Sequence, residues 1–534
     1  MIRTTLFILP VLLLAQACSD QSAEQPQTQA VTDPAAQTVQ PSPAAISMEV
    51  PVLAELSTTM LNTMGGQAQL EALMSLTMKG SGTRQHLGQV PATGAVDPAG
   101  TLSELTEVID FATGSAGMDY RVQIGTDFTQ HRTEAYTLYQ GTRLGWGTTE
   151  GRPNIVTSVN GLFSWSVHNN PEWLLRRNPV TVALSITNVA PDAIVSERSL
   201  DGTAFWYINT VLNDESLGLY IDRQTSQLKA FSAIDTETMW GDTNAIYVLG
   251  DYRPVGSVTL PHALEIRKDD GVYATVQYDS MLVNDSASLA VLTVPADVTG
   301  QADEVVAVEG SAWAPLQWNA VAANVTHALA FSHHSMVVEF PSFVVVVEGA
   351  YTEAQSLTLA RLIEENIGKP IRYVVPTHPH FDHTGGLRAL ASLGANVLVA
   401  AGHEAEIRRI IESPHTNPAD ALAQKISEGA TVGQVEVFTG MTEISDGDQT
   451  LQLFEVTGIP HVSPKVLAYV PSTGVLFQSD LFFGAPGPDA SALYKAITDL
   501  GLNVQQIVGG HGGVLAFQTL ADAVNNPPAP APTP

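Results

Sequence analysis

Three histidines and one aspartate stand within six consecutive residues of this chain. They are His378, His380, Asp382 and His383. Imidazole nitrogen and carboxylate oxygen are preferred ligands of borderline cations such as zinc, and three or four of them must converge on one point. Residues 371–375, before the cluster, are typical of a buried strand, and residues 387–393, after it, of an amphipathic helix. We therefore predict a metal site on a strand-to-helix loop.

The chain around this cluster alternates short apolar strands with amphipathic helices. The expected strands are 336–340, 343–347, 396–400, 451–456, 466–470, 475–478 and 504–508, and the expected helices are 352–367 and 404–412. Alternation of this kind is typical of a layered α/β domain. At 534 residues the chain is too long for one ordinary core, so a second folded domain is expected.

The first half of the chain has a different pattern. Helical periodicity over residues 48–74, interrupted at Gly65-Gly66, precedes segments that alternate apolar and polar residues, as antiparallel strands do. The expected strands include 76–82, 102–111, 120–125, 204–212, 218–221, 228–234 and 272–283, with a hairpin turn at Asp270-Gly271. We predict an antiparallel β-rich domain with N-terminal helices over residues 48–299.

This β-rich region resembles the half-barrel domains of lipoprotein-carrier type. The resemblance lies in its helix, Gly-Gly and strand opening and in the phrases Tyr252-Arg253-Pro254-Val255 and Leu260-Pro261-His262. Such sheets often enclose an apolar ligand, which makes a lipid-binding envelope lipoprotein with a structural metal domain one alternative function. A structural or substrate-shaping role is the other interpretation of this region.

The N-terminus has the layout of an export signal. Arg3 precedes an apolar run at residues 6–15, and Ala17 precedes Cys18, the only cysteine. The run is shorter than the ~20 residues that span a membrane. Residues 1–18 resemble a bacterial lipoprotein signal, which implies a periplasmic or outer-membrane-anchored protein lipidated at Cys18. Cleavage after Ala17, giving a free periplasmic protein, is the alternative. Residues 19–47 are expected to be a disordered linker, and residues 525–534 a disordered tail.

The charge of the chain restricts its partners. It contains 54 acidic and 24 basic residues, for a formal net charge of -30. This charge repels nucleic acid and anionic membrane surfaces. We therefore expect a small-molecule substrate, no nucleic acid, and membrane attachment only through the N-terminal lipid. The sequence leaves the oligomeric state open.

Three later residues extend the cluster at Asp382. They are His461 after Gly458-Ile459-Pro460, Asp480 after Phe477-Gln478-Ser479, and His511 after Gly509-Gly510. With these residues, the segment 304–524 resembles the metallo-beta-lactamase superfamily, whose signature is His-x-His-x-Asp-His after a strand, followed by single ligands at later strand ends. The resemblance implies an αββα sandwich that carries catalysis, and all seven ligand positions are present in order.

The resemblance also implies a dinuclear zinc site. His378, His380 and His461 would hold the first ion, Asp382, His383 and His511 the second, and Asp480 would bridge them. A bridging hydroxide would attack a carbonyl, with Asp382 and Asp480 as catalytic residues. The positive charge of two divalent cations exceeds the negative charge of two aspartates and one hydroxide, so the site would attract a developing oxyanion. Histidine and aspartate do not exclude iron or manganese.

The residue at position 480 narrows the chemistry that the resemblance implies. True beta-lactamases of this fold usually have cysteine or serine where this chain has Asp480. The resemblance therefore favours hydrolysis of an ester, lactone, thioester or amide, and the charge of -30 disfavours the nucleases of the superfamily. Beta-lactamase-like or sulfatase-like hydrolysis and an iron enzyme of oxygen or sulfur chemistry remain as alternatives.

Four other histidines and two tryptophans can be interpreted either as structural residues or as residues that contribute to the site. His403 and His415 flank an expected helix and are interpreted as surface or packing residues. His333-His334 precede an expected strand, either as turn residues or as residues that reach toward the metals and contact substrate. Trp313 and Trp318 are interpreted as core residues, with substrate contact as the alternative.

Overall fold

A computed structural model describes most of the chain after residue 48. The described residues are 49–86, 88–89, 98–124, 128–151, 154–160, 162–163, 171–190, 192–237, 239–269, 271–302, 316–330, 333–349, 351–416 and 419–526. The predicted signal with Cys18, the predicted linker, Trp313 and most of the predicted tail lie outside them. Residues 50–534 form one compact unit. Among the described helices, none combines the length and the apolar composition that crossing a bilayer requires.

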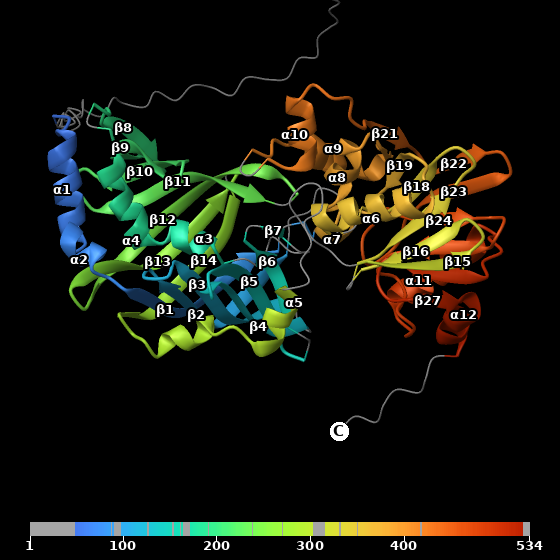
Figure 1. Cartoon of the computed structure of the whole chain (residues 1–534), viewed down its shortest axis with the longest axis horizontal. Coiled ribbons are helices and arrows are strands. Elements are labelled where there is room, and N and C mark those ends of the chain that lie inside the picture. Colours follow the sequence, from blue (N-terminus) through green and yellow to red (C-terminus); the bar gives the residue numbers. More distant parts are fainter. Residues whose placement is uncertain are drawn as a thin grey trace, which may run out of the picture. The chain divides into compact units, whose positions relative to one another are not determined.

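The first part of this unit is a 14-stranded antiparallel sheet (Figure 1). Its order is β7-β6-β5-β4-β3-β2-β1-β14-β13-β12-β11-β10-β9-β8, so two meanders are joined where the first strand pairs with the last. The strands are β1 (Ser75–Gln85), β2 (Ala99–Asp110), β3 (Ser115–Ile124), β4 (Phe128–Tyr139), β5 (Thr142–Thr149), β6 (Ile155–Val159), β7 (Leu162–Phe163), β8 (Ser196–Leu200), β9 (Thr203–Leu212), β10 (Glu215–Asp222), β11 (Leu228–Glu237), β12 (Gly241–Val255), β13 (Val258–Lys268) and β14 (Gly271–Val283). The antiparallel β-rich prediction is confirmed. Strands β13 and β14 pair at Lys268 and Gly271, while Asp270 of the predicted turn lies outside the described residues.

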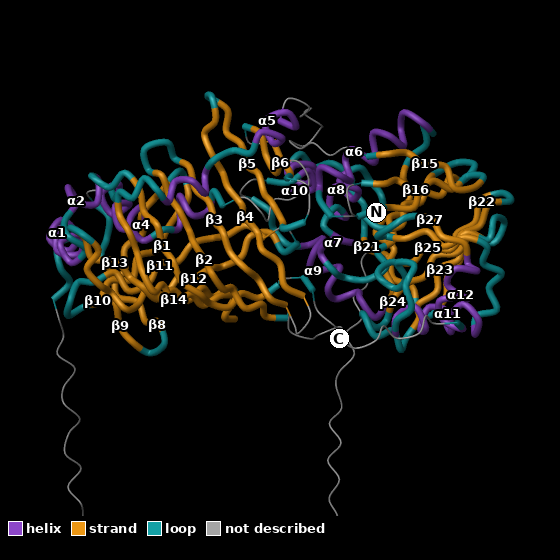
Figure 2. The backbone as a smooth tube through the Cα atoms, turned by 90° about the horizontal axis from the view of Figure 1, so that it is seen from below, coloured by secondary structure: helices purple, strands orange, loops and turns teal. Residues whose placement is uncertain are grey.

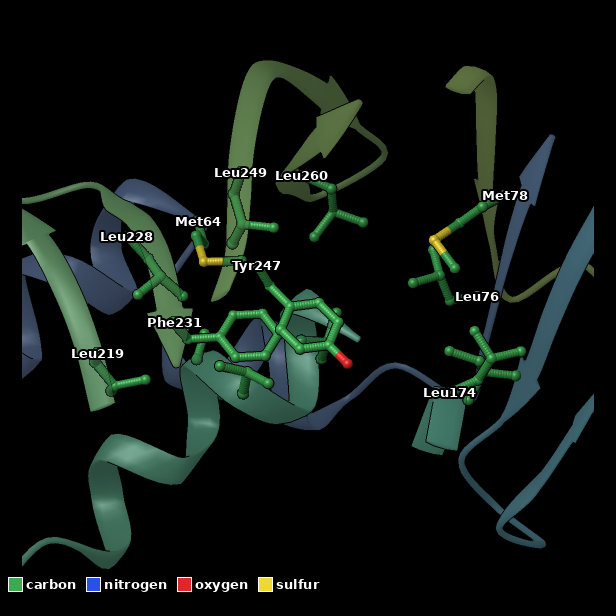
Figure 3. Close-up of a cluster of buried hydrophobic side chains, with 14 of the residues drawn as sticks. Met64, Leu76, Met78, Leu174, Leu219, Leu228, Phe231, Tyr247, Leu249 and Leu260 are labelled. Carbon is green, nitrogen blue, oxygen red and sulfur yellow. The ribbon is translucent and has the colours of Figure 1, made fainter. Parts of the chain in front are cut away.

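Helices and apolar side chains lie on both faces of this sheet, with the larger apolar cluster on one face and a smaller cluster, which includes Val298, on the other. The helices are α1 (Leu53–Thr63), α2 (Gln67–Glu71), α3 (Trp173–Arg177), α4 (Pro179–Leu184) and α5 (Ala296–Ala302), with short 3-10 turns at Ser185–Asn188 and Ser288–Leu292. The predicted break falls between α1 and α2, where Gly65 has a φ of 110° and a Cβ would lie 2.7 Å from Ser257 O. Figure 3 shows Phe231 and Tyr247 stacked beside Leu249 and Leu260. A large cluster of buried apolar side chains therefore lies between these strands and helices.

The second part contains two facing sheets. One has the order β15-β16-β17-β18-β19-β20-β21 and the other β22-β23-β24-β25-β26-β27. Their strands are β15 (Gln317–Ala322), β16 (Val325–Leu329), β17 (Ser335–Glu339), β18 (Val344–Val347), β19 (Ile371–Val375), β20 (Asn396–Ala400), β21 (Val435–Phe438), β22 (Met441–Asp446), β23 (Gln449–Val456), β24 (Lys465–Val470), β25 (Val475–Gln478), β26 (Gln506–Gly509) and β27 (Val514–Ala516). Parallel pairing joins β18 to β19 and β25 to β26, as expected where helices connect successive strands.

Helices cover the outer faces of both sheets (Figures 1 and 2). The helices are α6 (Glu353–Asn366), α7 (Phe381–Thr384), α8 (Leu387–Ser392), α9 (Glu404–Glu412), α10 (Ala421–Ser427), α11 (Pro488–Asp499) and α12 (Phe517–Asn525), with a 3-10 turn at Ala401–His403. One apolar cluster, including Val345 and Phe477, lies between the sheets. Two others pack α6 and α8–α10 on one sheet and α11 and α12 on the other. The predicted αββα sandwich is confirmed.

The interior of the N-terminal sheet contains a titratable group that makes stability depend on pH. Glu107 on β2 is 3% exposed and accepts a 2.7 Å hydrogen bond from Tyr278 Oη on β14. Burial raises the pKa of Glu107 from 4.5 to about 7, although the bond from Tyr278 and the charge of Arg84 oppose this rise. The folded state therefore keeps a proton that the unfolded chain has already lost, so stability falls as pH rises from about 4.5 to about 7.

We predict that Glu107→Gln removes this pH dependence. Above pH 7 the wild type has lost stability on the order of 3 kcal/mol through ionisation of Glu107, whereas the amide has no such loss. Thermal unfolding of the full chain, followed by circular dichroism at pH 5 and pH 8, measures the difference. The variant should gain melting temperature relative to wild type at pH 8 more than at pH 5. An exposed control, Glu55→Gln on α1, should track wild type at both values. An equal effect of Glu107→Gln at both pH values would contradict the prediction.

Candidate metal centre

The seven predicted ligand residues follow strand ends of both sheets. His378, His380, Asp382 and His383 follow β19, His461 follows β23, Asp480 follows β25, and His511 follows β26. In layered α/β structures, ligands bind beyond the carboxyl ends of the strands, where loops from neighbouring strands meet. The strands thus carry residues that are more than 100 positions apart in the sequence to one place.

The first group of potential ligands has Asp480 at its centre. It comprises His378, His380, His461 and Asp480, whose ligand atoms all lie within 4.8 Å of one another. Asp480 Oδ2 lies 3.1 Å from His378 Nε2 and 3.3 Å from His461 Nε2. The rings of His378 and His380 are 4.5 Å apart at 67°, so they do not stack face to face.

The second group shares Asp480 with the first. It comprises His383, Asp480 and His511. Asp480 Oδ2 lies 2.9 Å from His383 Nε2, and Asp480 Oδ1 lies 3.1 Å from His511 Nε2. Asp382 Oδ2 adds a further carboxylate oxygen, 3.4 Å from His383 Nε2 and 3.5 Å from His511 Nε2. The structure therefore brings all seven predicted residues together, with Asp480 between the two groups.

The polar atoms of this cluster cannot all satisfy one another by hydrogen bonds, whereas metal ions could bind them. The Nε2 atoms of His378, His383 and His461 all face Asp480 Oδ2, yet a carboxylate oxygen has only about two lone-pair positions. In the described part of the chain, none of these four atoms has a hydrogen-bond partner, although all are buried. Buried polar atoms are rarely left in this state. Divalent cations would satisfy all of them, and the nitrogen and oxygen donors suit zinc.

Comparison with known proteins finds one matching family. The sequence model of the metallo-beta-lactamase superfamily matches residues 329–516, a segment that contains all seven residues. Among solved structures, a metallo-beta-lactamase from Pontibacter korlensis is similar at 18% identity, over 39% of this chain and 96% of that one, with a TM-score of 0.30. One from Hirschia baltica is similar at 16% identity, over 39% and 96%, with a TM-score of 0.29.

A buried glutamate orients one histidine of the metallo-beta-lactamase domain. Glu348, directly after β18, is completely buried, and its Oε2 lies 2.9 Å from His383 Nδ1. Its Oε1 accepts a 2.5 Å hydrogen bond from Thr377 Oγ1. These contacts leave Nε2 of His383 directed at Asp480, and such carboxylate–histidine pairs fix the ring of a metal ligand. Gly510 makes room for this pair, because a Cβ there would lie 2.7 Å from Glu348 Oε2.

Backbone conformation at the site is unusual at three residues. Glu348, Tyr351 and Asp480 have φ values of 68°, 57° and 63°, in the left-handed region that residues with a Cβ seldom adopt. Strain of this kind clusters at functional sites, where surrounding structure holds it in place. At Asp480 the turn directs the side chain between both histidine groups at the end of β25.

Lys465 is a charged neighbour that the sequence analysis missed. It begins β24, is completely buried, and its Nζ lies 3.6 Å from Asp480 Oδ2. Burial lowers the pKa of Lys465, while the carboxylate of Asp480 opposes this shift. Burial alone would raise the pKa of Asp480, but the charges of His383 and Lys465 bring it well below its usual range. The lysine therefore helps to keep Asp480 ionised. Its signal in the sequence is a single lysine at the start of an apolar strand.

Asp382 has two further partners beyond the expected set. Its Oδ1 accepts a 2.9 Å hydrogen bond from Gln89 Nε2, which belongs to the segment between β1 and β2. Its Oδ2 lies 3.2 Å from His333 Nε2. No pattern in the sequence connects Gln89 with Asp382. His333 was one of two residues for which both a turn and a site interpretation were open, and the structure places it against the site.

His334, His403, His415 and Trp318 have packing roles. His403 Nε2 lies 2.7 Å from Pro464 O, and His415 is buried, with Nδ1 3.6 Å from Asp420. His334 accepts a hydrogen bond from Ala330 N and its ring lies edge-on to His327. Trp318 packs on the apolar cluster under α6 and α8. The interpretation of His403, His415 and Trp318 as packing residues agrees with these contacts.

We predict that Glu348→Gln weakens metal binding without unfolding the domain. The amide keeps the size of the side chain but loses the charge that holds His383, and loss of such a partner costs roughly 10- to 100-fold in metal affinity. Competition between the protein and a chromophoric chelator measures the affinity. Glu339→Gln is the control, because Glu339 ends β17 and pairs with Lys369 in the loop before β19. Unchanged affinity in Glu348→Gln would show that this carboxylate does not orient a ligand.

Proposed function

We propose that this protein is a hydrolase that uses two zinc ions to cleave an ester, lactone, thioester or amide bond in a small molecule. The observation that carries the proposal is the position of Asp480, which lies in both groups of potential ligands. His378, His380 and His461 would hold one ion and Asp382, His383 and His511 the other. A residue shared by two such groups is what a pair of adjacent metal ions requires.

In this reaction the residues of the chain would bind the metal ions, orient the attacking water and balance the charge of the site. Bound zinc ions would supply Lewis acidity and lower the pKa of water to near neutrality. Gln89 holds one oxygen of Asp382, so the other keeps a constant direction toward His383 and His511 and can orient the attacking water. Lys465 adds positive charge beside Asp480. A net positive centre favours the transition state of acyl transfer, in which negative charge develops on oxygen.

Two features support the substrate class. The carboxylate of Asp480 stands where true beta-lactamases of this fold usually have a softer or smaller ligand, which favours acyl substrates other than β-lactams. The net charge of -30 disfavours polyanionic substrates. The segment between β1 and β2 reaches Asp382, which supports a structural or substrate-shaping role for the N-terminal domain. Gln89 is a direct example of such a contribution.

A substrate panel with metal quantified in the same preparation tests the proposal. We expect turnover of at least one lactone, thioester or simple ester by protein that contains zinc, loss of turnover on chelation, and recovery on adding zinc back. Turnover of a sulfate ester or a β-lactam alone would favour those alternatives instead. Preferential binding of iron, with ester and lactone turnover unaffected by chelation, would exclude the proposed reaction.

We predict that Asp480→Asn abolishes most turnover and lowers the metal content. Asparagine tolerates the left-handed backbone at this position, so the change removes charge with little added strain. Turnover should fall by roughly two to three orders of magnitude, as when a charge-stabilising group is removed from an active site. Elemental analysis and the substrate assay measure both effects. Asp499→Asn on the exposed face of α11 is the control. Retained turnover with two metal ions per chain would overturn the bridging role.

We further propose that the protein is exported and anchored to a membrane through a lipid on Cys18. The arrangement of Arg3, the apolar run and Cys18 supports this location. Cys18→Ser should move the protein from the membrane fraction to the soluble periplasmic fraction of a bacterial host, because serine cannot take the thioether-linked lipid. Immunoblots of fractionated cells provide the measurement, with Ser19→Ala as a neighbouring control that stays anchored. Continued membrane association of Cys18→Ser would point to another anchor.

A further inference from the structure

His333 lies at the edge of the cluster, two residues before β17. Its side chain is 13% exposed, and Nε2 lies 3.2 Å from Asp382 Oδ2. The same oxygen faces Nε2 of His383 at 3.4 Å and Nε2 of His511 at 3.5 Å. Three imidazole nitrogens from three separate loops therefore converge on one carboxylate oxygen. The family pattern accounts for two of them and leaves His333 without a role.

The spacing of these atoms is that of ligands around one ion. Donor atoms bound tetrahedrally at about 2.0–2.1 Å from zinc lie about 3.4 Å from one another. The three distances to Asp382 Oδ2, from 3.2 to 3.5 Å, match this spacing. The corresponding distances in the first group, 3.1 and 3.3 Å to Asp480 Oδ2, match it as well. His333 thus lies at ligand spacing from Asp382, and with Asp382 and His511 it forms a group whose potential ligand atoms all lie within 4.8 Å of one another.

The ring arrangement gives a second comparison. The rings of His333 and His511 are 4.4 Å apart at 70°. The rings of His378 and His380, two expected ligands of the first ion, are 4.5 Å apart at 67°. The pair His333 and His511 therefore repeats the arrangement of a ligand pair.

Neighbouring residues hold His333 in this direction. Its ring stacks on Tyr351 at 4.3 Å and 6°, and Tyr351 itself has the unusual φ of 57°. Its backbone oxygen accepts a 2.6 Å hydrogen bond from Gln355 Nε2 on α6. Support of this kind is what a metal ligand needs, because its ring must be oriented before the ion binds. The adjacent His334 instead faces Ala330 N and His327.

The geometry points to His333 as an additional ligand of the second metal ion, beside Asp382, His383, His511 and Asp480. This inference rests on the proposed metal centre and deepens it. The first ion would then have four protein ligands and the second five. Loss of His333 would therefore weaken the binding of one ion and leave the other unchanged.

Cobalt(II) titration of the full-length protein tests this ligand. The d–d absorption of Co²⁺ strengthens as the number of ligands falls, so it reports coordination independently of turnover. Wild type should bind two Co²⁺ per chain. His333→Ala should lower the affinity for one of the two by at least roughly tenfold and strengthen the absorption of that ion. His334→Gln on the same loop should bind as wild type does, and melting of the metal-free proteins checks that all variants fold.

A second variant separates a ligand from a hydrogen-bond donor. His333→Gln can still donate a hydrogen bond to Asp382 but is a poor zinc or cobalt ligand, so it should show the same loss as His333→Ala. Wild-type affinity and absorption in His333→Gln would overturn the inference in favour of a hydrogen-bonding role, and no change in either variant would overturn it outright. Failure of the hydrolase proposal would appear separately, as a wild type that binds two Co²⁺ but turns over no substrate in the panel.

Discussion

Asp480 has to remain ionised inside a buried cluster, with its carboxylate directed between two groups of potential ligands. Much of the second domain contributes to holding it there. A carboxylate buried in this way is costly unless positive charge compensates it. Here the compensation comes from the imidazoles and from Lys465, which is itself buried 3.6 Å away. Without these partners, Asp480 would take up a proton and could not serve two groups of ligands. The left-handed backbone at Asp480 is the local strain that accompanies this position.

Residues that hydrogen-bond to the potential metal ligands fix the direction of the ligand rings. An imidazole has two nitrogens, and only one of them can face a metal ion while the other has a partner on the protein. For His383 that partner is Glu348, which Thr377 and the space at Gly510 hold in place. Parallel strands position these groups, since β18 and β19 end side by side and direct Glu348 and Thr377 toward each other. The rigid sandwich thus sets the tautomer and direction of a ligand through backbone pairing.

The N-terminal sheet contributes to this centre at one described point, the hydrogen bond from Gln89 to Asp382. Gly88 also accepts a hydrogen bond from the backbone of Phe381, within the ligand loop itself. The sheet makes further contacts with the second part of the chain, among them hydrogen bonds from Thr416 to Asp242, and its own core includes the protonatable pair of Glu107 and Tyr278. A domain with a contact to a potential metal ligand fits a positioning role. Its effect would be exerted on Asp382, the residue proposed to orient water.

Several features could be predicted from the sequence because they depend on local pattern. The spacing of His378 to His383, the alternation of strands and helices, and the break at Gly65-Gly66 each express short-range constraints of backbone and ligand geometry, and the structure has the corresponding elements. The order of His461, Asp480 and His511 indicated which later residues would converge, although their action as ligands remains a prediction. Composition likewise predicted that nucleic acid and anionic membrane surfaces are disfavoured partners, because the net charge can be counted from the sequence without knowing the fold.

Only the tertiary structure decided which polar residues surround those ligands. Glu348, Lys465, Gln89 and His333 have no common motif, and each belongs to a separate segment whose own pattern indicates a strand, a turn or a loop. They meet because parallel strands of two sheets end at one edge and because a loop after β1 reaches Asp382. Contacts between segments that are distant in the chain depend on packing, which local periodicity does not encode. The sequence by itself therefore determined the class of centre, and packing determined the charge, direction and number of the side chains around it.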